Sequence, residues 1–191
     1  MDIFFIGIIS YLLGSIPFGL LLTKIFLKKD IREIGSGNIG ATNVLRAGNK
    51  TIGYITLILD ILKAVAPVIY VKIFYQDFLY ISSLCAFLGH VFPVWLKFKG
   101  GKGVATYVGI LFSINLIYGL IFVIAWILIF LFSRYSSLAS LISSFSIPIY
   151  VFIFTENQTI FFIILFVLIF YAHRENIKRL KNKEESKSKI Y

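Results

Sequence analysis

The amino-acid sequence predicts an all-α integral membrane protein with seven transmembrane helices, the N-terminus outside, the C-terminus cytoplasmic and two short helices in the middle. The first observation is that 59% of the 191 residues are hydrophobic and the mean hydropathy is +0.90, whereas about half of a soluble domain is apolar. The second is that the apolar runs approach the roughly 20 residues of a spanning helix and do not alternate as barrel strands do. The third is that basic residues gather in short segments between the runs, where they mark the cytoplasmic side.

The charge and the cysteine content narrow the possible partners and cofactors. A formal net charge of +10 would suggest nucleic acid in a soluble protein, but basic residues beside membrane spans contact anionic lipids or anionic substrates instead. Cys85 is the only cysteine in the sequence, and no group of aspartates has the spacing of a divalent-metal site. The sequence therefore predicts no nucleic-acid partner, no metal, no cofactor and no obligatory protein partner.

The first predicted span, Ile3 to Phe26, carries three residues that disturb a regular helix. Gly14, Ser15 and Pro17 should kink it or let a neighbouring helix approach closely. Four basic residues lie at its end, between Lys24 and Arg32, and the positive-inside rule places this end in the cytoplasm. The polar stretch that comes next is therefore expected to be cytoplasmic.

Two spans follow, from Ile52 to Phe74 and from Phe78 to about Phe98, joined by a short external turn. The first of them carries Asp60 and Lys63, which are close enough on a helix to face each other. This pair is interpreted either as a neutralised pair turned into the helix bundle or as part of an ion path in a transporter. The first interpretation is favoured because a single pair does not make a relay.

The apolar run from Val104 to Phe132 decides the orientation of everything after it. As a single helix it would place Arg134 and the later basic residues outside. As a hairpin of two short helices that turns between Asn115 and Gly119, it keeps them inside, although each arm has only about 13 residues, fewer than the roughly 20 of an upright span. The positive-inside rule favours the hairpin.

The last two predicted spans run from Leu138 to Phe154 and from Thr159 to Ala172, with an external turn at residues 156–157 between them. Residues 1–177 then form a single polytopic membrane domain. The charged segment 178–191 is expected to be a short, basic and mobile cytoplasmic tail.

A polar stretch, GSGNIGATNVLR from Gly35 to Arg46, interrupts the apolar sequence. Its glycines let the backbone expose N–H groups, its short polar side chains add donors, and its arginine adds a cation, a combination suited to phosphate. The dinucleotide-binding pattern GxGxxG also fits, but it requires a preceding strand, whereas an apolar helix and a basic patch come before it. A solvated loop that merely turns the chain back is the alternative. The candidate binding residues are Gly35, Ser36, Gly37, Asn38, Gly40, Thr42, Asn43 and Arg46.

A second stretch, GHVFPVWLKFKGGKGVAT from Gly89 to Thr106, ends in a loop rich in lysine and glycine that leads into a helix. Backbone N–H groups at a helix N-terminus, together with two lysines, would bind an anion. The P-loop pattern cannot be aligned on it. A basic loop that only sets topology is the alternative, but such a loop does not need three glycines. The candidate residues are Lys99, Gly100, Gly101, Lys102, Gly103 and Thr106.

The sequence His173-Arg174-Glu175-Asn176 ends the last span with four polar side chains. His173 and Asn176 can donate to a phosphate, Arg174 can pair with one, and Glu175 could act as a base or brace a helix. A solvated helix end is the alternative interpretation. Ser137, near the start of the preceding span, belongs to a weaker polar set on the same side of the membrane.

Two glycine-rich anion cradles and many cations beside a lipid-accessible helix bundle suggest a transfer reaction. The partners would be a phosphate-bearing small molecule and a molecule with an apolar tail. Neither His90 nor His173 has an aspartate five positions later, which argues against the common acyl-CoA glycerolipid acyltransferases. A small anion or organophosphate transporter is the alternative function, but no internal repeat supports it.

Several segments, spread over essentially the whole chain, carry a resemblance to one family. They are Gly14-Ser15-Ile16-Pro17, the two polar stretches, the segment from Arg134 to Ser140, and His173-Arg174-Glu175-Asn176. The chain resembles the bacterial membrane glycerol-3-phosphate acyltransferases that use acyl phosphate as donor, the PlsY family. The resemblance implies a seven-helix protein of the bacterial inner membrane with active-site loops facing the cytoplasm. It also implies the first acylation of phospholipid synthesis, which turns acyl phosphate and glycerol 3-phosphate into 1-acyl-glycerol 3-phosphate (lysophosphatidate) and phosphate.

The same resemblance implies roles for individual residues. The loop from Gly100 to Gly103 would bind glycerol 3-phosphate, and Glu175 would be structural. Because phosphate is a good leaving group, we expect direct acyl transfer without an acyl-enzyme. The group that accepts the hydroxyl proton is left open between the departing phosphate, His173 and Glu175. The residues implied to be important for activity are Ser36, Asn38, Arg46, His173 and Asn176.

Overall fold

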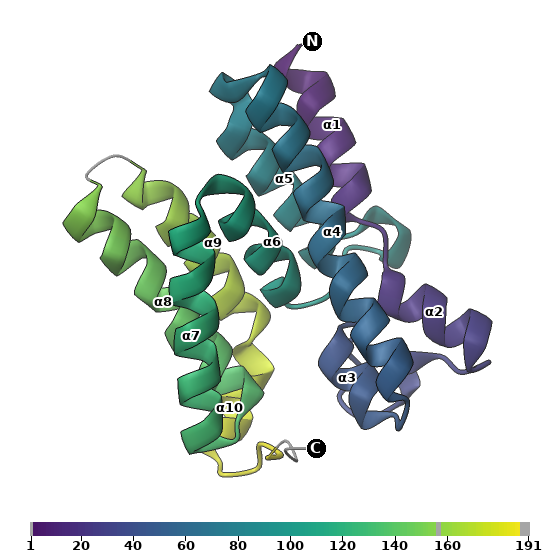
Figure 1. The fold of residues 1–191 in the computed structure, drawn as a ribbon. Helices are drawn as coiled ribbons and strands as arrows, with labels where there is room; N and C mark the ends of the chain where they lie inside the picture. Colours follow the sequence, from purple (N-terminus) through teal and green to yellow (C-terminus); the bar gives the residue numbers. More distant parts are fainter. Residues whose placement is uncertain (1, 156–157, 188–191) are drawn as a thin grey trace. The chain divides into compact units, whose positions relative to one another are not determined.

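The computed structural model describes residues 2–155 and 158–187, and every regular element in these residues is a helix. The chain divides into two compact units, Met1–Ile114 and Asn115–Tyr191, which can be followed by colour in Figure 1. Within the described residues, five segments are long and apolar enough to cross a membrane, or six if the bent pair Thr159–Ala172 and Arg174–Lys181 forms one span. The protein is therefore an all-helical, multi-pass integral membrane protein.

The first unit is built around one long helix. Its elements are α1 (Ile3–Gly14), α2 (Phe18–Phe26), η1 (Ile31–Glu33), α3 (Ala41–Arg46), α4 (Lys50–Phe74), η2 (Gln76–Phe78), α5 (Leu79–Val91), η3 (Val94–Leu96) and α6 (Val104–Ile114). The central helix is α4, because α1, α2, α3, α5 and α6 all pack against it. Figure 1 shows α4 running through this unit with α3 beside its first turns.

Small residues bring α1 and α5 into close contact. A β-carbon on Gly14 would overlap the backbone of Ala86, and one on Gly89 would overlap the carbonyl oxygen of Tyr11. Neither glycine therefore has room for a side chain, as is common where membrane helices approach each other closely. The first span also breaks, since α1 ends at Gly14 and α2 begins only after Pro17. Both predictions for this region are confirmed.

The charged pair on α4 lies inside the first unit. The ammonium of Lys63 lies 2.8 Å from Asp60 Oδ1, and the side chains are only 2% and 3% exposed. Lys63 also donates to the carbonyl of Ile16 over 2.8 Å, in the segment where α1 gives way to α2. The pair is therefore turned into the bundle, as the favoured interpretation predicted.

The apolar run from Val104 to Phe132 is broken at Asn115, within the predicted interval. The side-chain oxygen of Asn115 accepts a 2.8 Å hydrogen bond from the N–H of Ile117 and so caps α7 (Leu116–Ser133). The two arms are unequal, with 11 residues in α6 and 18 in α7. Because α7 is long enough to be a candidate span, the expectation that both helices are short is wrong for α7.

In the part of the second unit that the structure describes, there are three long helices and one short amphipathic helix. The long ones are α7, α8 (Ser136–Phe154) and α9 (Thr159–Ala172), and the short one is α10 (Arg174–Lys181). α8 packs against α7 and α9, partly through a 3.0 Å hydrogen bond from Trp126 Nε1 to Ser140 Oγ. α10 leaves α9 at an angle of 61°.

The C-terminal segment is more ordered than the sequence suggested. Residues 178–181 belong to α10, and Glu185 beyond it is buried and hydrogen-bonded to other parts of the second unit. The predicted mobile tail is therefore packed as far as Glu185. The predicted external turn at Glu156 and Asn157 lies outside the described residues.

Candidate active site

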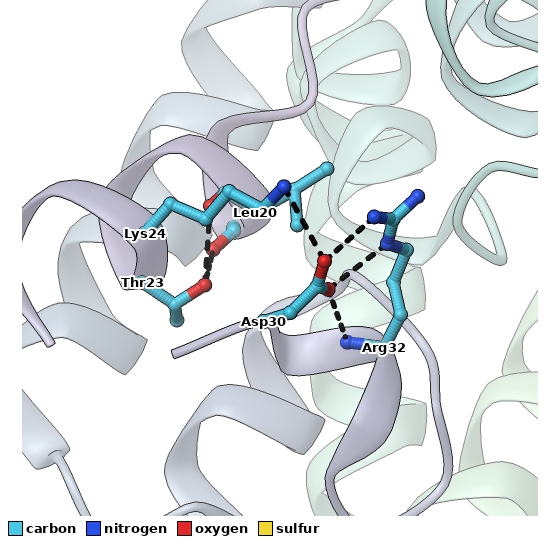
Figure 2. Close-up of polar contacts among 6 residues, drawn as sticks. Leu20, Thr23, Lys24, Asp30 and Arg32 are labelled. Atoms are coloured by element: carbon cyan, nitrogen blue, oxygen red, sulfur yellow. Dashed lines mark hydrogen bonds and ion pairs between the residues drawn. The ribbon is translucent and has the colours of Figure 1, made fainter. Parts of the chain in front are cut away.

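One aspartate fixes the segment that leads into the first polar stretch. Figure 2 shows the Asp30 carboxylate between Lys24 of α2 and Arg32 of η1. Arg32 donates from Nε and Nη2 over 2.9 and 2.6 Å and from its backbone N–H over 3.0 Å, while Lys24 Nζ lies 3.3 Å away. The hydrogen bonds from Arg32 hold the pKa of Asp30 well below its usual range. The carboxylate is therefore ionised at neutral pH, and the polar stretch starts from a fixed point.

Asn43 organises the first polar stretch from inside. Its side-chain amide donates to the carbonyls of Ile31, Ile34 and Asn38 over 3.1, 2.9 and 2.9 Å, and its oxygen accepts from the N–H of Ser36 over 2.9 Å. Asn43 is only 2% exposed. The sequence suggested Asn43 as a ligand-binding residue, but the structure uses its amide to hold the loop together.

Glycines and an asparagine shape the remaining turns of this stretch. Gly35 and Gly37 have φ angles of +59° and +70°, a left-handed conformation that a β-carbon disfavours. Asn38 Oδ1 accepts a 2.9 Å hydrogen bond from the N–H of Gly40, which closes a side-chain-mediated turn. The exposed polar residues of this stretch are Ser36 in the turns and Thr42 and Arg46 on α3.

The second polar loop is attached to the end of α5 by its backbone. The N–H groups of Gly100 and Gly101 donate to the carbonyls of Val91 and His90, both over 3.0 Å. The expectation that the glycine N–H groups are offered to an anion is therefore wrong for these two residues. The first N–H groups of α6, from Val104 onward, have no partner inside their own helix and are the backbone donors that suit an anion.

Packing requires the glycines of the second loop. A β-carbon on Gly100 would overlap the carbonyl oxygen of His90, one on Gly101 would overlap His90 Nε2, and one on Gly103 would overlap the ring of Phe87. Glycine therefore lets this loop lie directly on α5. Of the two lysines in the loop, Lys99 is exposed and Lys102 is half-buried.

Both loops are attached to the same face of α4. Leu45 packs so closely on Gly53 that a β-carbon there would lie 2.5 Å from Leu45 Cδ2. Thr106, in the first turn of α6, donates to the carbonyl of Asp60 over 3.3 Å. Gly53 and Asp60 are seven residues apart, which is about two helical turns and about 10 Å along the axis. The loops therefore meet α4 on one side, two turns apart.

In the second unit, a carboxylate from the C-terminal segment gathers the predicted polar residues. Glu185 Oε1 accepts from Ser137 Oγ over 2.8 Å and from Asn176 Nδ2 over 2.7 Å, and its Oε2 accepts from Arg179 Nε over 2.7 Å. Burial alone would raise the pKa of Glu185, but these hydrogen bonds outweigh it and lower the pKa. Ser137 and Asn176 are thus brought together on one ionised group.

His173 is held by the helix that precedes it. Its Nδ1 lies 2.8 Å from the carbonyl oxygen of Ile169. Because a carbonyl can only accept, Nδ1 carries the proton, and Nε2 is the basic nitrogen of the neutral ring. Glu175, which the resemblance marked as structural, is exposed, whereas Glu185 is the carboxylate that braces this region.

A comparison with known protein families covers nearly the whole chain. The family model for glycerol-3-phosphate acyltransferase matches residues 4–183. The chain belongs to this family.

Curated glycerol-3-phosphate acyltransferases are similar to the chain over most or all of its length. The protein of Pelagibacter ubique is 69% identical over 191 residues, which is 100% of both chains. The protein of Bradyrhizobium diazoefficiens is 51% identical over 94% of this chain and 92% of its own, and that of Brucella suis is 50% identical over 94% and 90%.

Two solved structures have the same fold as this acyltransferase. Both are crystal structures of PlsY (YgiH), described as an integral membrane glycerol 3-phosphate acyltransferase, at 41% identity and over 98% of this chain. The glycerol 3-phosphate form gives a TM-score of 0.91 and covers 96% of that chain, and the lysophosphatidic acid form gives 0.88 and 95%.

Two residues that hold the candidate site residues of the second unit, Glu185 and Arg179, were not found in the sequence. Glu185 and Arg179 lie in a run of charges that is typical of a solvated tail. The amphipathic pattern of residues 174–181 was the available signal, since a helix there would carry Asn176 and Arg179 on one face. Asn43 was found, but only as a polar residue in a polar loop, and no local pattern shows that its amide points inward.

Proposed function

We propose that this chain acylates glycerol 3-phosphate to lysophosphatidate by direct transfer from acyl phosphate. The observation that carries the function is the family match over residues 4–183, with 69% identity to a relative of the same length. The solved relative has forms named for glycerol 3-phosphate and lysophosphatidic acid, which are the acceptor and the product of this reaction. Acyl phosphate as the donor is supported by the resemblance of the two polar stretches.

The proposed reaction needs no covalent intermediate. The 1-hydroxyl oxygen of glycerol 3-phosphate attacks the acyl carbonyl carbon, the bond from that carbon to the phosphate oxygen breaks, and inorganic phosphate leaves. The hydroxyl proton passes to the departing phosphate or to Nε2 of His173. The main tasks of the protein are then to align the substrates and to neutralise phosphate charge.

In the first polar stretch, the exposed groups are proposed to contact substrate. Ser36 and Thr42 offer hydroxyl groups, and Arg46 offers a guanidinium that can bind a phosphate with two parallel hydrogen bonds. Asn38 and Asn43 are proposed to act indirectly, because their side-chain oxygens and the Asn43 amide are used within the loop.

The second loop is proposed to bind the phosphate of glycerol 3-phosphate. Lys99 and Lys102 supply positive charge, and the first N–H groups of α6 supply donors at the positive end of a helix dipole. The glycines from Gly100 to Gly103 hold the loop on α5, and Thr106 holds the start of α6 on α4.

In the second unit, His173 and Asn176 are proposed to act on substrate. Nε2 of His173 can accept a proton or donate to phosphate once protonated. Asn176 Nδ2 is bound to Glu185, and its buried Oδ1 has no hydrogen-bond partner among the described residues. Ser137 and Glu185 are proposed to keep Asn176 in place, a role that the sequence had suggested for Glu175.

The membrane arrangement is also a proposal. Seven spans, with α6 as a short one, put Arg134 and the C-terminal basic residues on the same side as the two polar loops, and the positive-inside rule makes that side the cytoplasm. Residues 1–177 then form one membrane domain of the bacterial inner membrane, with 178–191 as its cytoplasmic extension.

A two-substrate assay tests the function. Purified protein given acyl phosphate and glycerol 3-phosphate should form lysophosphatidate, should form none with acyl-CoA as donor, and should show intersecting initial-rate patterns because both substrates bind together. Cys85→Ala is the matched control and should remain active. Uptake of glycerol 3-phosphate into vesicles without any product would contradict the proposal.

Direct transfer has its own test with radiolabelled acyl phosphate. Without glycerol 3-phosphate, the denatured protein should carry no acyl label. A label that survives denaturation and moves into lysophosphatidate when the acceptor is added would show an acyl-enzyme and would overturn direct transfer.

Labelling of single cysteines tests the sidedness. In a Cys85→Ala background, Lys50→Cys, Lys97→Cys and Ser186→Cys should react only from the cytoplasmic side, and Asn115→Cys only from outside. All four positions are exposed in the fold, so lack of labelling would reflect the membrane side. Labelling of Ser186→Cys from outside would overturn the seven-span arrangement.

A further inference from the structure

We propose that His90 is a positioning residue for the second polar loop, with its imidazole held between the Asp60–Lys63 ion pair and the backbone of Gly101. The proposal rests on the proposed function of this loop in binding glycerol 3-phosphate. According to the proposal, the buried cluster determines the position of Lys102. A change in the cluster should therefore weaken the binding of glycerol 3-phosphate more than the binding of acyl phosphate.

The cluster is made of buried ionisable side chains inside the first unit, where many of the other buried side chains are apolar. The side chains of Asp60, Lys63 and His90 are only 3%, 2% and 3% exposed. Burying charged groups is costly unless neighbouring polar groups offset the loss of water, and His90 is the third polar side chain in this cluster. Lys63 already neutralises Asp60, so a bound metal cation would bring a like charge into the same space. The contacts of His90 with Gly101 give it a positioning role.

The two ring nitrogens of His90 face different partners. Nδ1 lies 3.8 Å from Asp60 Oδ1 and has no hydrogen-bond partner among the described residues. Nε2 lies against Gly101, where a β-carbon would overlap it. The ring therefore fills the space between a charged pair on α4 and the backbone of the loop.

The loop also depends on the backbone at this position. The N–H of Gly101 donates to the carbonyl of His90 over 3.0 Å, so one residue contacts the loop through both its main chain and its ring. Lys102 is the next residue along the chain. A shift of the ring would move the backbone that carries Lys102, and a misplacement of about 1 Å can lower the rate about 100-fold.

The residues of the ion pair are also bonded to neighbouring segments, Lys63 through its side chain and Asp60 through its backbone carbonyl. Lys63 donates to the carbonyl of Ile16 over 2.8 Å, and Thr106 donates to the carbonyl of Asp60 over 3.3 Å. The cluster thus connects the break after α1, the middle of α4, the end of α5 and the start of α6. The loop between α5 and α6 is fixed at its two ends by the same group of residues.

The test separates the Michaelis constants of the two substrates. In His90→Ala, we expect KM for glycerol 3-phosphate to rise tenfold or more, with KM for acyl phosphate within twofold of the wild type. In a Lys102→Met background, His90→Ala should raise KM for glycerol 3-phosphate by less than a further twofold, because His90 acts through the position of that lysine. Ser83→Ala is the matched control, since this buried α5 hydroxyl, among the described residues, donates to the carbonyl of Leu79 in its own helix, and both constants should be unchanged.

A paired substitution keeps the proposal testable if the single variant folds poorly. Adding Gly101→Ala to His90→Ala places a methyl group where the ring was, so the double variant should recover part of the lost affinity for glycerol 3-phosphate. Gly101→Ala alone should weaken the binding of glycerol 3-phosphate, because the methyl group would overlap the ring. Asp60→Asn combined with Lys63→Met removes the ion pair without leaving a buried charge and should raise KM for glycerol 3-phosphate in the same way.

Two results would overturn the proposal. One is a folded His90→Ala protein whose KM for glycerol 3-phosphate lies within twofold of the wild type. The other is a loss of kcat in proportion to the folded fraction, with both KM values unchanged in all variants, which would mean that the cluster is only structural. If the wild-type protein forms no lysophosphatidate at all, the proposed function fails and not this inference alone.

Discussion

The two polar loops of the first unit are both rich in glycine, but they are held by different means. The first is held by a side chain, because the Asn43 amide group makes four hydrogen bonds, two to the loop backbone at Ser36 and Asn38 and two to the carbonyls of Ile31 and Ile34 just before it. The second is held by its own backbone, through N–H groups that donate to the end of α5. Gly35 and Gly37 provide left-handed turns, whereas Gly100 and Gly101 provide room for close packing.

This difference shows that glycine content alone does not identify the part of a loop that meets a ligand. In the second loop, close packing on α5 explains Gly100 and Gly101 without any ligand. In the first loop, the glycines bend the chain beside Ser36, which is exposed. Substitutions can separate the two uses of glycine, because a steric requirement and a conformational requirement respond to different replacements.

The largest effect is expected from Gly100→Ala. The added methyl would overlap the His90 carbonyl and would lie 2.7 Å from the Val91 carbonyl, and neither backbone group can move aside easily. We expect a loss beyond the about 1–3 kcal/mol of ordinary overpacking, seen as low folded yield and loss of lysophosphatidate formation. Gly7→Ala is the control, because its methyl would meet only Cys85 Sγ at 3.5 Å. Equal yields of the two variants would contradict the steric explanation.

Asn43→Ala should have the next largest effect and should act on the first loop. It would leave buried carbonyls and an N–H group without partners, and each unsatisfied buried group costs about 1–3 kcal/mol. Thermal unfolding in detergent should show the loss. Asn49→Ala, which removes only the side-chain cap of α4 at the N–H of Ile52, should cost about 1 kcal/mol. If Asn43→Ala were no more destabilised than Asn49→Ala, the first loop would not depend on this side chain.

Glu185→Gln tests whether a charged residue that holds its surroundings by hydrogen bonds responds to pH differently from the neutral amide of Asn43. Losing hydrogen bonds to a charged group should cost about 1.5–3 kcal/mol at pH 7. Because the pKa of Glu185 is lowered in the folded state from its ordinary value of 4.5, its stabilisation is fully present above pH 4.5 and is lost as the pH falls below that value. The stability gap to the wild type should therefore shrink in acid. The gap for Asn43→Ala should not, and parallel pH curves for the two variants would be the contrary result.

The smallest effect is expected at Gly37, where conformation is the main requirement. Gly37→Ala should cost about 1–2 kcal/mol because φ is +70° and a β-carbon disfavours this region. Gly37→Asn should cost less, since asparagine tolerates left-handed backbone. Gly100→Asn, by contrast, should be as damaging as Gly100→Ala. Unfolding midpoints of the four variants give the measurement, and rescue of Gly100 by asparagine would contradict the distinction.

Much of the fold could be predicted because an apolar run of about 20 residues has few alternatives in a bilayer. α9 begins and ends at Thr159 and Ala172 as predicted, and the break in the first span was visible at Gly14 and Pro17. The length of α7 was not predicted, because charge balance decides the side of the membrane and not the residue at which a helix starts. A local cap at Asn115 decides that residue.

The candidate site could be predicted as a set of polar residues but not as a set of roles. A role depends on contacts between residues far apart in the sequence, such as Asn43 with Ile31 across 12 positions and Ser137 with Glu185 across 48. A carboxylate within a run of charges has the same local pattern whether it is solvated or returns to the bundle. The resemblance marked Glu175 as structural, and no local pattern in the same run of charges marked Glu185, which is buried and hydrogen-bonded to Ser137 and Asn176.

Because both loops attach to one face of α4, the number of residues between Gly53 and Asp60 determines the angle around the helix axis at which the second loop meets α4. Each residue inserted or deleted there would rotate everything beyond it by about 100° and shift it by about 1.5 Å. The two loops would then meet α4 on different sides, even with every loop residue unchanged. Side chains that face away from the bundle in this segment, such as Ile55 and Ile58 at 38% and 55% exposed, can vary in identity, so the constraint falls on the number of residues and hardly on their type.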